Sequence, residues 1–385
     1  MKSSSGDRYR PLPCWREGRR GRRPITSGAP CTRWGEADDF PLLRAVCERG
    51  RRRAFPCSCL SVHPYNKTDT MKPIIEAVPK ELIERELTEE RLLRATNNAG
   101  NFIYTIKAAE APDIMREIGR LRELAFRQAG GGTGNEVDVD EQDLAPDGYT
   151  QLFVWDPVAR EILGGYRYII CDSPYPKNLS TEHYFRFSDR FRQEVLPYTI
   201  ELGRSFVQPR YQRTRDAKSL YALDNLWDGL GALIVENPDK QYFFGKVTMY
   251  GHYDKEARNI LMYFLQKYFP DRDGLLEPLY PVEMNIDVPA MERIFAGGSY
   301  MDDYRTLVNE LRKRDEFIPP MINSYMNLSP SMKVFSTVHN PDFGEVEETG
   351  ILVRIKDIYP EKAERHTRGL LQKLKKRIKS VSGGE

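Results

Sequence analysis

The sequence predicts a mixed α/β (α+β) protein built around a largely antiparallel sheet with helices on its faces. Segments with strand composition alternate with segments whose apolar residues recur at helical spacing. The segments 149–155 and 162–171 are joined by a short turn at Asp156-Pro157, which predicts a hairpin. The 385 residues are 40% hydrophobic and 30% charged, which is ordinary for a soluble enzyme with a sizeable core. No run approaches the roughly 18 apolar residues that cross a bilayer.

The elements before the hairpin are predicted from charge and hydrophobic period. The range 80–93 is highly charged and is expected to form one or two helices, within an N-terminal helical segment at 71–100. A strand at 102–108 leads into an amphipathic helix at 111–128, whose apolar residues share one face. The glycine-rich segment 130–134 ends this helix in a flexible loop, because it lacks the full G-x-G-x-x-G spacing of a dinucleotide site.

After the hairpin, strands and helices alternate. The predicted strands are 199–208, 242–250, 333–338 and 350–355, and the predicted helices are 216–235 and 255–269. The range 270–316 is rich in proline, then charged and helical, and is expected to form an insertion. Residues 359–385 are expected to form a basic amphipathic tail, in which four apolar residues share one helix face.

Residues 1–70 differ in composition from the rest of the chain. They carry 15 Lys and Arg against 7 Asp and Glu, a net of +8, whereas the remainder has a net of −6. We expect that the start codon was assigned too early and that the protein proper begins at Met71; a disordered tail is the alternative. One of the six cysteines then remains, which fits a reducing cytoplasm. A nucleic-acid-binding arm is the alternative, but no aromatic platform accompanies the arginines, so no nucleic-acid partner is expected.

Seven charged residues fall in or beside the predicted core elements. They are Arg122, Asp138, Asp140, Asp143, Arg167, Glu201 and Arg204. Glu201 and Arg204 lie inside a strand, where an unpaired charge is costly. The set has two possible roles. It forms buried ion pairs that hold the fold, or it forms a reaction centre in which a shielded carboxylate accepts a proton from an amine attacking a carbonyl.

The motifs of several other mechanisms are absent from the sequence. There is no G-x-S-x-G elbow, no P-loop and no H-E-x-x-H. No H-x-x-x-x-D occurs, since His63 and His183 each have an aspartate six residues on. The histidines and cysteines show no paired metal-ligand spacing, so no metal site is expected.

Between about residues 98 and 358, several short motifs occur in a fixed order. They are Leu121-Arg122-Glu-Leu-Ala-Phe126, Asp138-x-Asp140-x-x-Asp143, Gly165-Tyr-Arg167, Glu201-Leu-Gly-Arg204-x-Phe-Val, Ala222-Leu-Asp-Asn225-Leu-Trp227, Ile318-Pro-Pro320-Met-Ile-Asn-Ser-Tyr325 and Asn340-Pro-Asp-Phe343-Gly344. Together they resemble the acyl-carrier-protein-dependent N-acyltransferases that are similar to autoinducer synthases. These are GNAT-fold enzymes that include the ornithine-lipid and glycine-lipid N-acyltransferases. The segments 129–134 and 243–249 are most similar to the glycine N-acyltransferases of glycine-lipid synthesis.

The resemblance implies a GNAT-like domain over residues 101–358, with the 270–316 insertion inside it. It implies that Glu201 is the general base, acting directly or through water, and that backbone N–H groups after it polarise the thioester carbonyl. Arg204 and Arg167 would then organise the acidic loop, and Arg122 would pair with Asp140 or Asp143. Three aromatic residues are expected to line the acyl pocket or to pack the core: Phe126, Phe206 and Trp227.

The segment after the Glu201 strand departs from the pattern of enzymes that use coenzyme A. Those enzymes usually carry Q/R-x-x-G-x-G/A, whose N–H groups cradle pyrophosphate, whereas residues 208–219 contain no glycine. A phosphopantetheine thioester on an acyl carrier protein is therefore the expected co-substrate, in preference to acyl-CoA, and no bound cofactor is implied. The residues expected to bind the acidic carrier protein are Arg210, Arg213, Arg215 and Lys218, unless they form a solvated basic loop.

The sequence thus predicts transfer of a long 3-hydroxyacyl chain from acyl carrier protein to the α-amine of a small amino acid, with glycine favoured, as the first step of a glycine-lipid pathway. Ornithine or another amine is the alternative acceptor. A non-catalytic module that binds the carrier protein or a lipid surface is the alternative class, although the presence of Glu201 and Arg204 argues against it. The basic tail fits peripheral contact with an anionic membrane from the cytoplasm, or a solvated tail.

Overall fold

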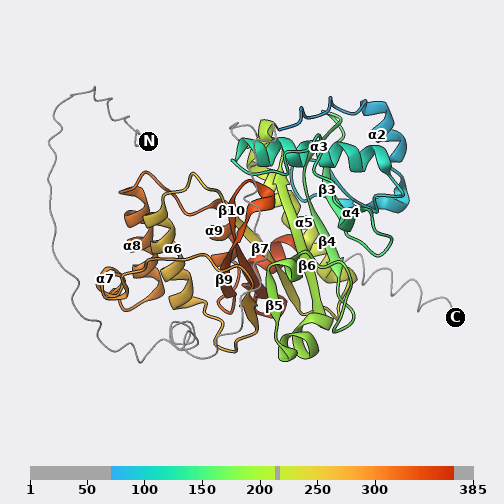
Figure 1. Ribbon diagram of the computed structural model, residues 1–385. Helices are drawn as coiled ribbons and strands as arrows, with labels where there is room; N and C mark the ends of the chain where they lie inside the picture. Colours follow the sequence, from blue (N-terminus) through green and yellow to red (C-terminus); the bar gives the residue numbers. More distant parts are fainter. Residues whose placement is uncertain (1–70, 213–216, 368–385) are drawn as a thin grey trace, which may run out of the picture. The chain divides into compact units, whose positions relative to one another are not determined.

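A computed structural model describes residues 71–212 and 217–367, and an eight-stranded sheet forms the centre of this part (Figure 1). The sheet has the order β1-β2-β3-β4-β6-β7-β10-β9, and its neighbouring strands are antiparallel except for the parallel pair β6–β7. The strands are β1 (Leu92–Ala95), β2 (Phe102–Ile106), β3 (Thr150–Asp156), β4 (Glu161–Ile170), β6 (Thr199–Val207), β7 (Tyr242–Met249), β9 (Lys333–Asn340) and β10 (Val346–Arg354). The predicted mixed and largely antiparallel sheet is confirmed.

Helices and a small second sheet surround this centre. The helices are α2 (Lys80–Glu86), α3 (Pro112–Gln128), α4 (Glu141–Leu144), α5 (Ala217–Glu236), α6 (Lys255–Tyr268), α7 (Val288–Ile294), α8 (Tyr300–Arg312) and α9 (Pro320–Met326). Strands β5 (Phe185–Phe187) and β8 (Leu276–Pro278) pair with each other, and the 3-10 helix η2 (Ser180–His183) precedes β5. Within the described ranges, no helix combines the length and the apolar character that a bilayer crossing requires.

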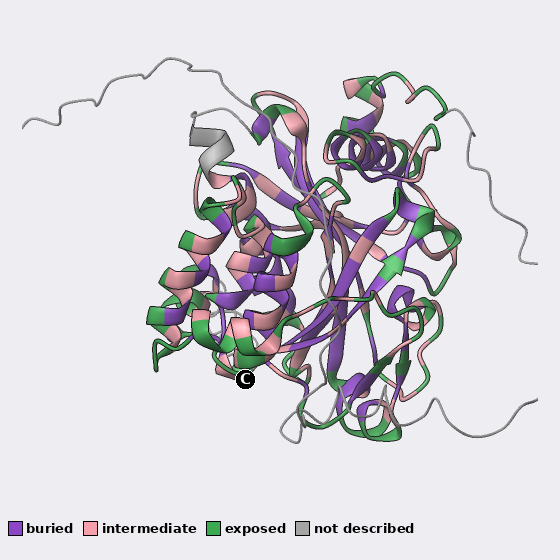
Figure 2. Ribbon diagram, turned by 60° about the vertical axis from the view of Figure 1, so that its left-hand side comes forward, coloured by how far each residue is buried: buried purple, intermediate pink, exposed green. Residues whose placement is uncertain are grey.

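The two faces of the sheet carry separate apolar cores. Because side chains alternate along a strand, Leu152 and Val154 of β3 pack with α5, whereas Phe153 and Trp155 pack with α3. Figure 2 shows the resulting burial along the central strands. We call these the α5 face and the α3 face. The side chains of α6 and α9 join the core of the α5 face.

Two differences from the predicted elements have local causes. Residues 92 and 93, expected to be helical, lie in β1, because Leu92 pairs across to Tyr104 of β2. The sheet therefore begins before the predicted domain boundary at residue 101. The glycine-rich loop, expected to be flexible, is held by the buried carboxylate of Glu123, which accepts hydrogen bonds from the N–H groups of Thr133 (3.0 Å) and Gly134 (2.8 Å).

The predicted insertion at 270–316 contains α7 and α8, and α8 packs against α6 (Figure 1). The expectation for residues 1–70 lies outside the described residues, and so does that for 368–385 of the tail. The backbone between 360 and 367 is helical.

Strands β6 and β7 pair over only four residues and then separate. Thr199–Leu202 of β6 is in register with Tyr242–Gly245 of β7. Beyond Leu202, β6 shifts its register against β4, and Arg204 adopts the left-handed conformation with φ of 48°. This bulge turns β6 away from the regular ladder at the position where the candidate site lies.

Candidate active site

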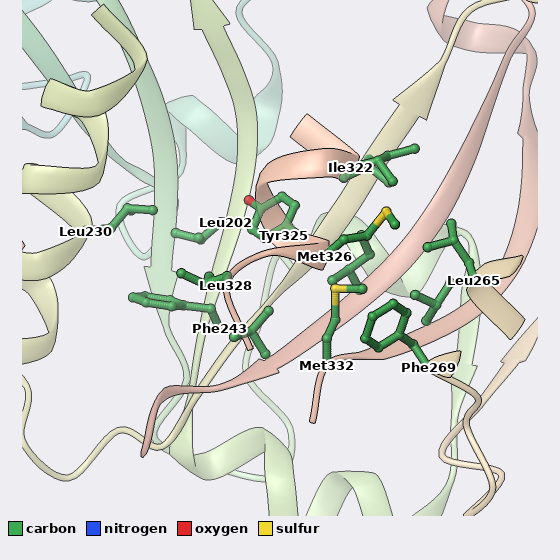
Figure 3. Close-up of a cluster of buried hydrophobic side chains, with 14 of the residues drawn as sticks. Leu202, Leu230, Phe243, Leu265, Phe269, Ile322, Tyr325, Met326, Leu328 and Met332 are labelled. Atoms are coloured by element: carbon green, nitrogen blue, oxygen red, sulfur yellow. The ribbon is translucent and has the colours of Figure 1, made fainter. Parts of the chain in front are cut away.

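A cavity of about 200 Å³ lies where β6 and β7 separate. Its apolar lining comes from the α5 face of the sheet and from α9, and includes Leu202, Phe243, Tyr325, Ile351 and Val353. Figure 3 shows Leu202, Phe243 and Tyr325 within this core. The charged lining comes from the α3 face and consists of Arg167, Arg204, Lys246 and Glu348. The cavity thus passes from a charged side of the sheet to an apolar side.

The acidic loop is fixed by a capping arrangement at the start of α4. The N–H of Asp143 donates to Asp140 Oδ1 at 2.9 Å, and the N–H of Asp140 donates to Asp143 Oδ2 at 3.3 Å. The spacing of these two aspartates therefore has a local structural reason. The remaining oxygens of both aspartates lie next to Arg167 of β4, and Asp143 Oδ2 also accepts a hydrogen bond from Arg122 of α3.

Three arginines converge on the three aspartates of this loop. The fully buried Arg122 pairs with Asp143 at 3.0 Å, and Arg122 also donates to Gln151. Arg167 Nη1 lies 2.7 Å from Asp140 Oδ2 and 3.3 Å from Asp143 Oδ1. The structure therefore selects Asp143 as the partner of Arg122, out of the two carboxylates expected.

Arg204 completes this set from β6. Its Nε lies 3.0 Å from Asp138 Oδ2 and its Nη2 lies 3.7 Å from Asp140 Oδ2. The guanidinium also lies over the ring of Phe343, 4.4 Å from the ring centre. Its side chain is 18% exposed and lines the cavity. The bulge in β6 thus directs Arg204 to the cavity. Its ion-pair partners, Asp138 and Asp140, lie outside the cavity lining.

Burial and charge act in opposite directions on these carboxyl groups. Burial raises the pKa of Asp138, against the opposing charges of Arg204 and Arg122. Burial alone would also raise the pKa of Asp143, but the charges of Arg122 and Arg167 outweigh it and hold that pKa well below its usual range. Asp143 is therefore ionised throughout the neutral range.

Glu201 is fully buried on the α3 face and is surrounded by hydroxyl groups. Its Oε1 accepts hydrogen bonds from Tyr149 (2.6 Å) and Ser180 (2.9 Å), and its Oε2 accepts one from Thr181 (2.8 Å). Burial, followed by the charge of Glu201, raises the pKa of Tyr149 well above its usual value, so Tyr149 remains a donor. Glu201 itself does not line the cavity, but Ser180 does. The carboxylate therefore reaches the cavity through Ser180.

The three aromatic residues predicted for the acyl pocket have different positions. Phe126 lines the cavity, on its charged side, with its ring centre 5.0 Å from that of Phe343. Phe206 is not part of the lining and is buried in the core of the α3 face. Trp227 also lies outside the lining, but its ring centre is 5.7 Å from that of the lining residue Tyr325.

The predicted donor-binding cations are described only in part. Arg210 has a side chain that is 66% exposed, and it pairs with Glu161 at 3.0 Å. Arg213 and Arg215 lie outside the described residues, as does the side chain of Lys218.

Sequence reasoning missed several residues of the site. No motif marks Tyr149, Ser180 and Thr181. Their hydroxyl groups share a role only because the fold brings all three next to Glu201 of β6. Lys246 and Glu348, which pair at 2.8 Å, had a weak signal, since each is a charge inside a strand-forming segment.

Comparisons with known proteins agree with this architecture. Residues 121–222 match the family model described as Acetyltransferase (GNAT) domain. A glycine N(alpha)-acyltransferase of Phocaeicola vulgatus is 48% identical over 319 residues, which cover 81% of this chain and 98% of that protein. A glycine N(alpha)-acyltransferase of Bacteroides thetaiotaomicron is 50% identical over 308 residues, which cover 78% of this chain and 91% of that protein.

Among solved structures, a CoA-dependent acyl-homoserine lactone synthase, MesI, aligns with 69% of this chain and 94% of its own, at 11% identity and a TM-score of 0.28. The two relatives at about half identity are matched over nearly their full length. The chain is therefore an acyltransferase with a GNAT domain, and it belongs to the glycine N(alpha)-acyltransferase family.

Proposed function

We propose that this chain transfers a 3-hydroxyacyl group from acyl carrier protein to the α-amine of glycine, as the first step in the synthesis of an aminolipid. The observation that carries the proposal is the cavity between β6 and β7, which joins a charged side to an apolar side. An amino acid and an acyl chain need these two environments at one reaction centre. The names of the two relatives support glycine as the acceptor.

The apolar side of the cavity is proposed to hold the acyl chain next to the thioester. Leu202, Phe243 and Val353 line it and belong to the buried core of the α5 face. Figure 3 shows Leu202 and Phe243 in this core. Beyond Leu202, β6 is no longer paired with β7. The backbone groups of β6 that face β7 are therefore available to a substrate there. N–H groups there polarise the thioester carbonyl and stabilise the oxyanion that forms during attack.

Glu201 is proposed as the general base, with Ser180 as the link to the amine. The ammonium gives a proton to the Ser180 oxygen while Ser180 gives its own proton to Glu201 Oε1, 2.9 Å away. The free amine then forms the C–N bond and the C–S bond breaks. As the amide forms, its nitrogen loses a second proton, which the thiolate takes, so the donor leaves as the carrier-bound thiol. Glu201 then releases the first proton to solvent.

The donor is proposed to be a carrier-protein thioester, because the segment 208–219 lacks the glycines of a pyrophosphate cradle. The exposed Arg210 offers a positive group to an acidic carrier protein close to the end of β6. Peripheral contact of the basic tail with a membrane is a separate expectation that depends on residues outside the described ranges.

The test is an assay of the purified full chain with 3-hydroxyacyl carrier protein and glycine, with mass-spectrometric detection of N-(3-hydroxyacyl)glycine. Parallel reactions replace the donor by the matching acyl-CoA or glycine by ornithine. We expect product from carrier protein and glycine, with less from the other combinations. A higher kcat/KM for ornithine would overturn the acceptor, and a higher kcat/KM for acyl-CoA would overturn the donor. If no amine is acylated from either donor, the function is wrong.

A further inference from the structure

An oppositely charged pair on the cavity wall has no role in the reaction scheme above. Lys246 of β7 and Glu348 of β10 both line the cavity, and Lys246 Nζ lies 2.8 Å from Glu348 Oε2. In the β7–β10 ladder, Lys246 is opposite Gly350 and Glu348 is opposite Thr248, so the pair is diagonal on one face of the sheet. Its geometry is therefore set by regular strands rather than by a loop.

Both members of this pair are shielded from water. The side chain of Lys246 is 13% exposed and that of Glu348 is 3% exposed. Burial lowers the pKa of Lys246, and the charge of Glu348 opposes this shift. Burying two charges for one contact is a weak way to stabilise a fold, because the loss of solvation offsets much of the attraction. The pair therefore suggests a role in binding.

The pair also differs from the other charged residues of the cavity. The counter-ions of Arg167 and Arg204 are aspartates that stand outside the lining. Lys246 and Glu348 are each other's counter-ion, and both face the cavity. A ligand can thus reach both charges at once without disturbing the acidic loop.

We propose that Lys246 and Glu348 bind the acceptor amino acid as a zwitterion, with Lys246 Nζ holding its carboxylate and Glu348 holding its ammonium. The inference rests on the proposed function and names the residues that recognise the acceptor. A free amino acid carries both charges. When it binds, its carboxylate replaces Glu348 as the partner of Lys246, and its ammonium replaces Lys246 as the partner of Glu348. No buried charge is then left unmatched. An amine that lacks a carboxylate can pair with Glu348, but it offers Lys246 no carboxylate in exchange.

The residues around Lys246 and Glu348 fit the step that follows binding, in which the ammonium loses its proton. Asn340 Nδ2 donates to Glu348 Oε1 at 3.1 Å, which fixes this carboxylate. The ring of Tyr184 lies under Lys246, 4.0 Å from Nζ to the ring centre. Tyr184 comes shortly after Ser180, which also lines the cavity. The ammonium held by Glu348 is therefore on the same side of the sheet as the hydroxyl that takes its proton.

The charge balance of the lining also bears on the choice of acceptor. In the part of the chain that the structure describes, Glu348 is the single carboxylate among the residues lining this cavity. An acceptor with a second ammonium group, such as ornithine, would need a further carboxylate. The pair therefore favours an amino acid with an uncharged side chain.

The experiment compares glycine with glycinamide, which keeps the amine but has no carboxylate, as acceptors at a saturating concentration of the acyl donor. In the Lys246→Met variant, we expect KM for glycine to rise at least tenfold, while KM for glycinamide changes less than threefold. In Glu348→Gln, we expect KM to rise for both. KM for the acyl donor should not change in either variant. Equal losses with glycine and glycinamide in Lys246→Met would overturn the role of Lys246.

Two further variants separate recognition from folding. The double variant Lys246→Met/Glu348→Gln removes both buried charges and should fold. We expect glycine to raise the melting temperature of the parent protein but not that of this variant. Lys267→Met is the matched control, because it breaks another ion pair (2.6 Å, with Asp303) that lies outside the cavity lining. Its KM for glycine should match that of the parent. If glycine stabilises the double variant as well as the parent, the proposal is wrong. A parent protein that acylates no amine would instead contradict the proposed function.

Discussion

Arg122 of α3 and Asp143 of α4 form an ion pair of 3.0 Å in which both side chains are completely shielded from solvent. Arg122 also donates to Gln151 of β3, so one guanidinium joins a helix, the acidic loop and the sheet. The pair lies behind Arg167, which lines the cavity and contacts Asp143 at 3.3 Å. The stability of the acidic loop and the geometry of the cavity are thus connected through Asp143.

Asp143→Asn should destabilise the protein by about 3–5 kcal/mol at pH 7, because it leaves a buried arginine without its charge partner. The pKa of Asp143 is lowered in the folded protein, so its contribution is complete above the unfolded pKa of about 3.9 and is lost as pH falls below it. Urea unfolding at pH 7 and at pH 3 measures this. The variant should lose less stability than the parent between the two values. An equal loss would show that Asp143 does not control the acid response.

Ser180→Ala should lower kcat by about 10²-fold or more while leaving the fold intact, because it removes the hydroxyl that links Glu201 to the cavity. Glu201→Gln should lower kcat by at least as much. Thr181→Val is the matched control, since Thr181 makes a hydrogen bond of 2.8 Å to the same carboxylate but does not line the cavity. Steady-state rates with saturating glycine test the set. Comparable losses in Ser180→Ala and Thr181→Val would refute the relay.

Gly245→Ala should destabilise the fold by roughly 1–3 kcal/mol and reduce activity. A Cβ at Gly245 would approach the carbonyl oxygen of Leu202 to 2.5 Å, at the last pair of the β6–β7 register. At Gly251 the nearest atom to a new Cβ is 3.6 Å away, so Gly251→Ala serves as the control. Thermal unfolding and turnover are the measurements. A Gly245→Ala variant that unfolds and reacts like Gly251→Ala would show that this contact tolerates a side chain.

Ile351→Phe should shift the preference of the enzyme towards shorter acyl chains, because Ile351 lines the apolar side of the cavity. We expect kcat/KM for a long donor to fall at least about tenfold relative to a short one. Leu352→Phe adds a similar ring to the next residue of β10, which lies outside this cavity. A series of donors of different length tests both variants. The same chain-length profile in both would place the acyl chain elsewhere.

Arg210→Glu should raise KM for the acyl carrier protein and make it less sensitive to salt, because it reverses an exposed charge near the end of β6. KM for glycine should stay the same. Arg186→Glu is a suitable comparison, since Arg186 is as exposed as Arg210 and also pairs with a glutamate at 3.0 Å. Equal effects of the two substitutions on KM for the carrier protein would argue against a specific docking role for Arg210.

The sheet and its long helices could be predicted because their sequences contain the needed pattern. The helix expected at 111–128 is α3 (Pro112–Gln128), and its apolar face packs on the sheet as the period predicts. β1 was not predicted, because it has only four residues and directly follows the charged segment 80–91, so that only pairing with β2 makes it a strand. The strand β5 was missed for a similar reason, since it depends on β8, 91 residues away between Arg186 and Glu277.

The charged residues of the site could be found because each stands out in a strand, helix or loop sequence, as Arg122, Arg167 and Glu201 do. The distances of these residues from the substrate could not be predicted from the sequence. Glu201 lies behind Ser180 because the side chain alternates away from Leu202, which faces the apolar side. The Lys246–Glu348 pair depends on the register of β7 with β10, which no local pattern contains.

The short segment that runs from η2 into β5 has a further consequence for the evolution of acceptor choice. Ser180 and Thr181 contact Glu201, and Tyr184 covers Lys246, so a few consecutive residues serve the two functions that we propose for these side chains. A substitution that reshapes this segment to admit a larger amino acid would also displace the hydroxyl groups around the base. New acceptor preference should therefore arise more readily through changes on β7 and β10 than through changes in this loop. A directed library restricted to these two strands is the natural starting point for altering the product.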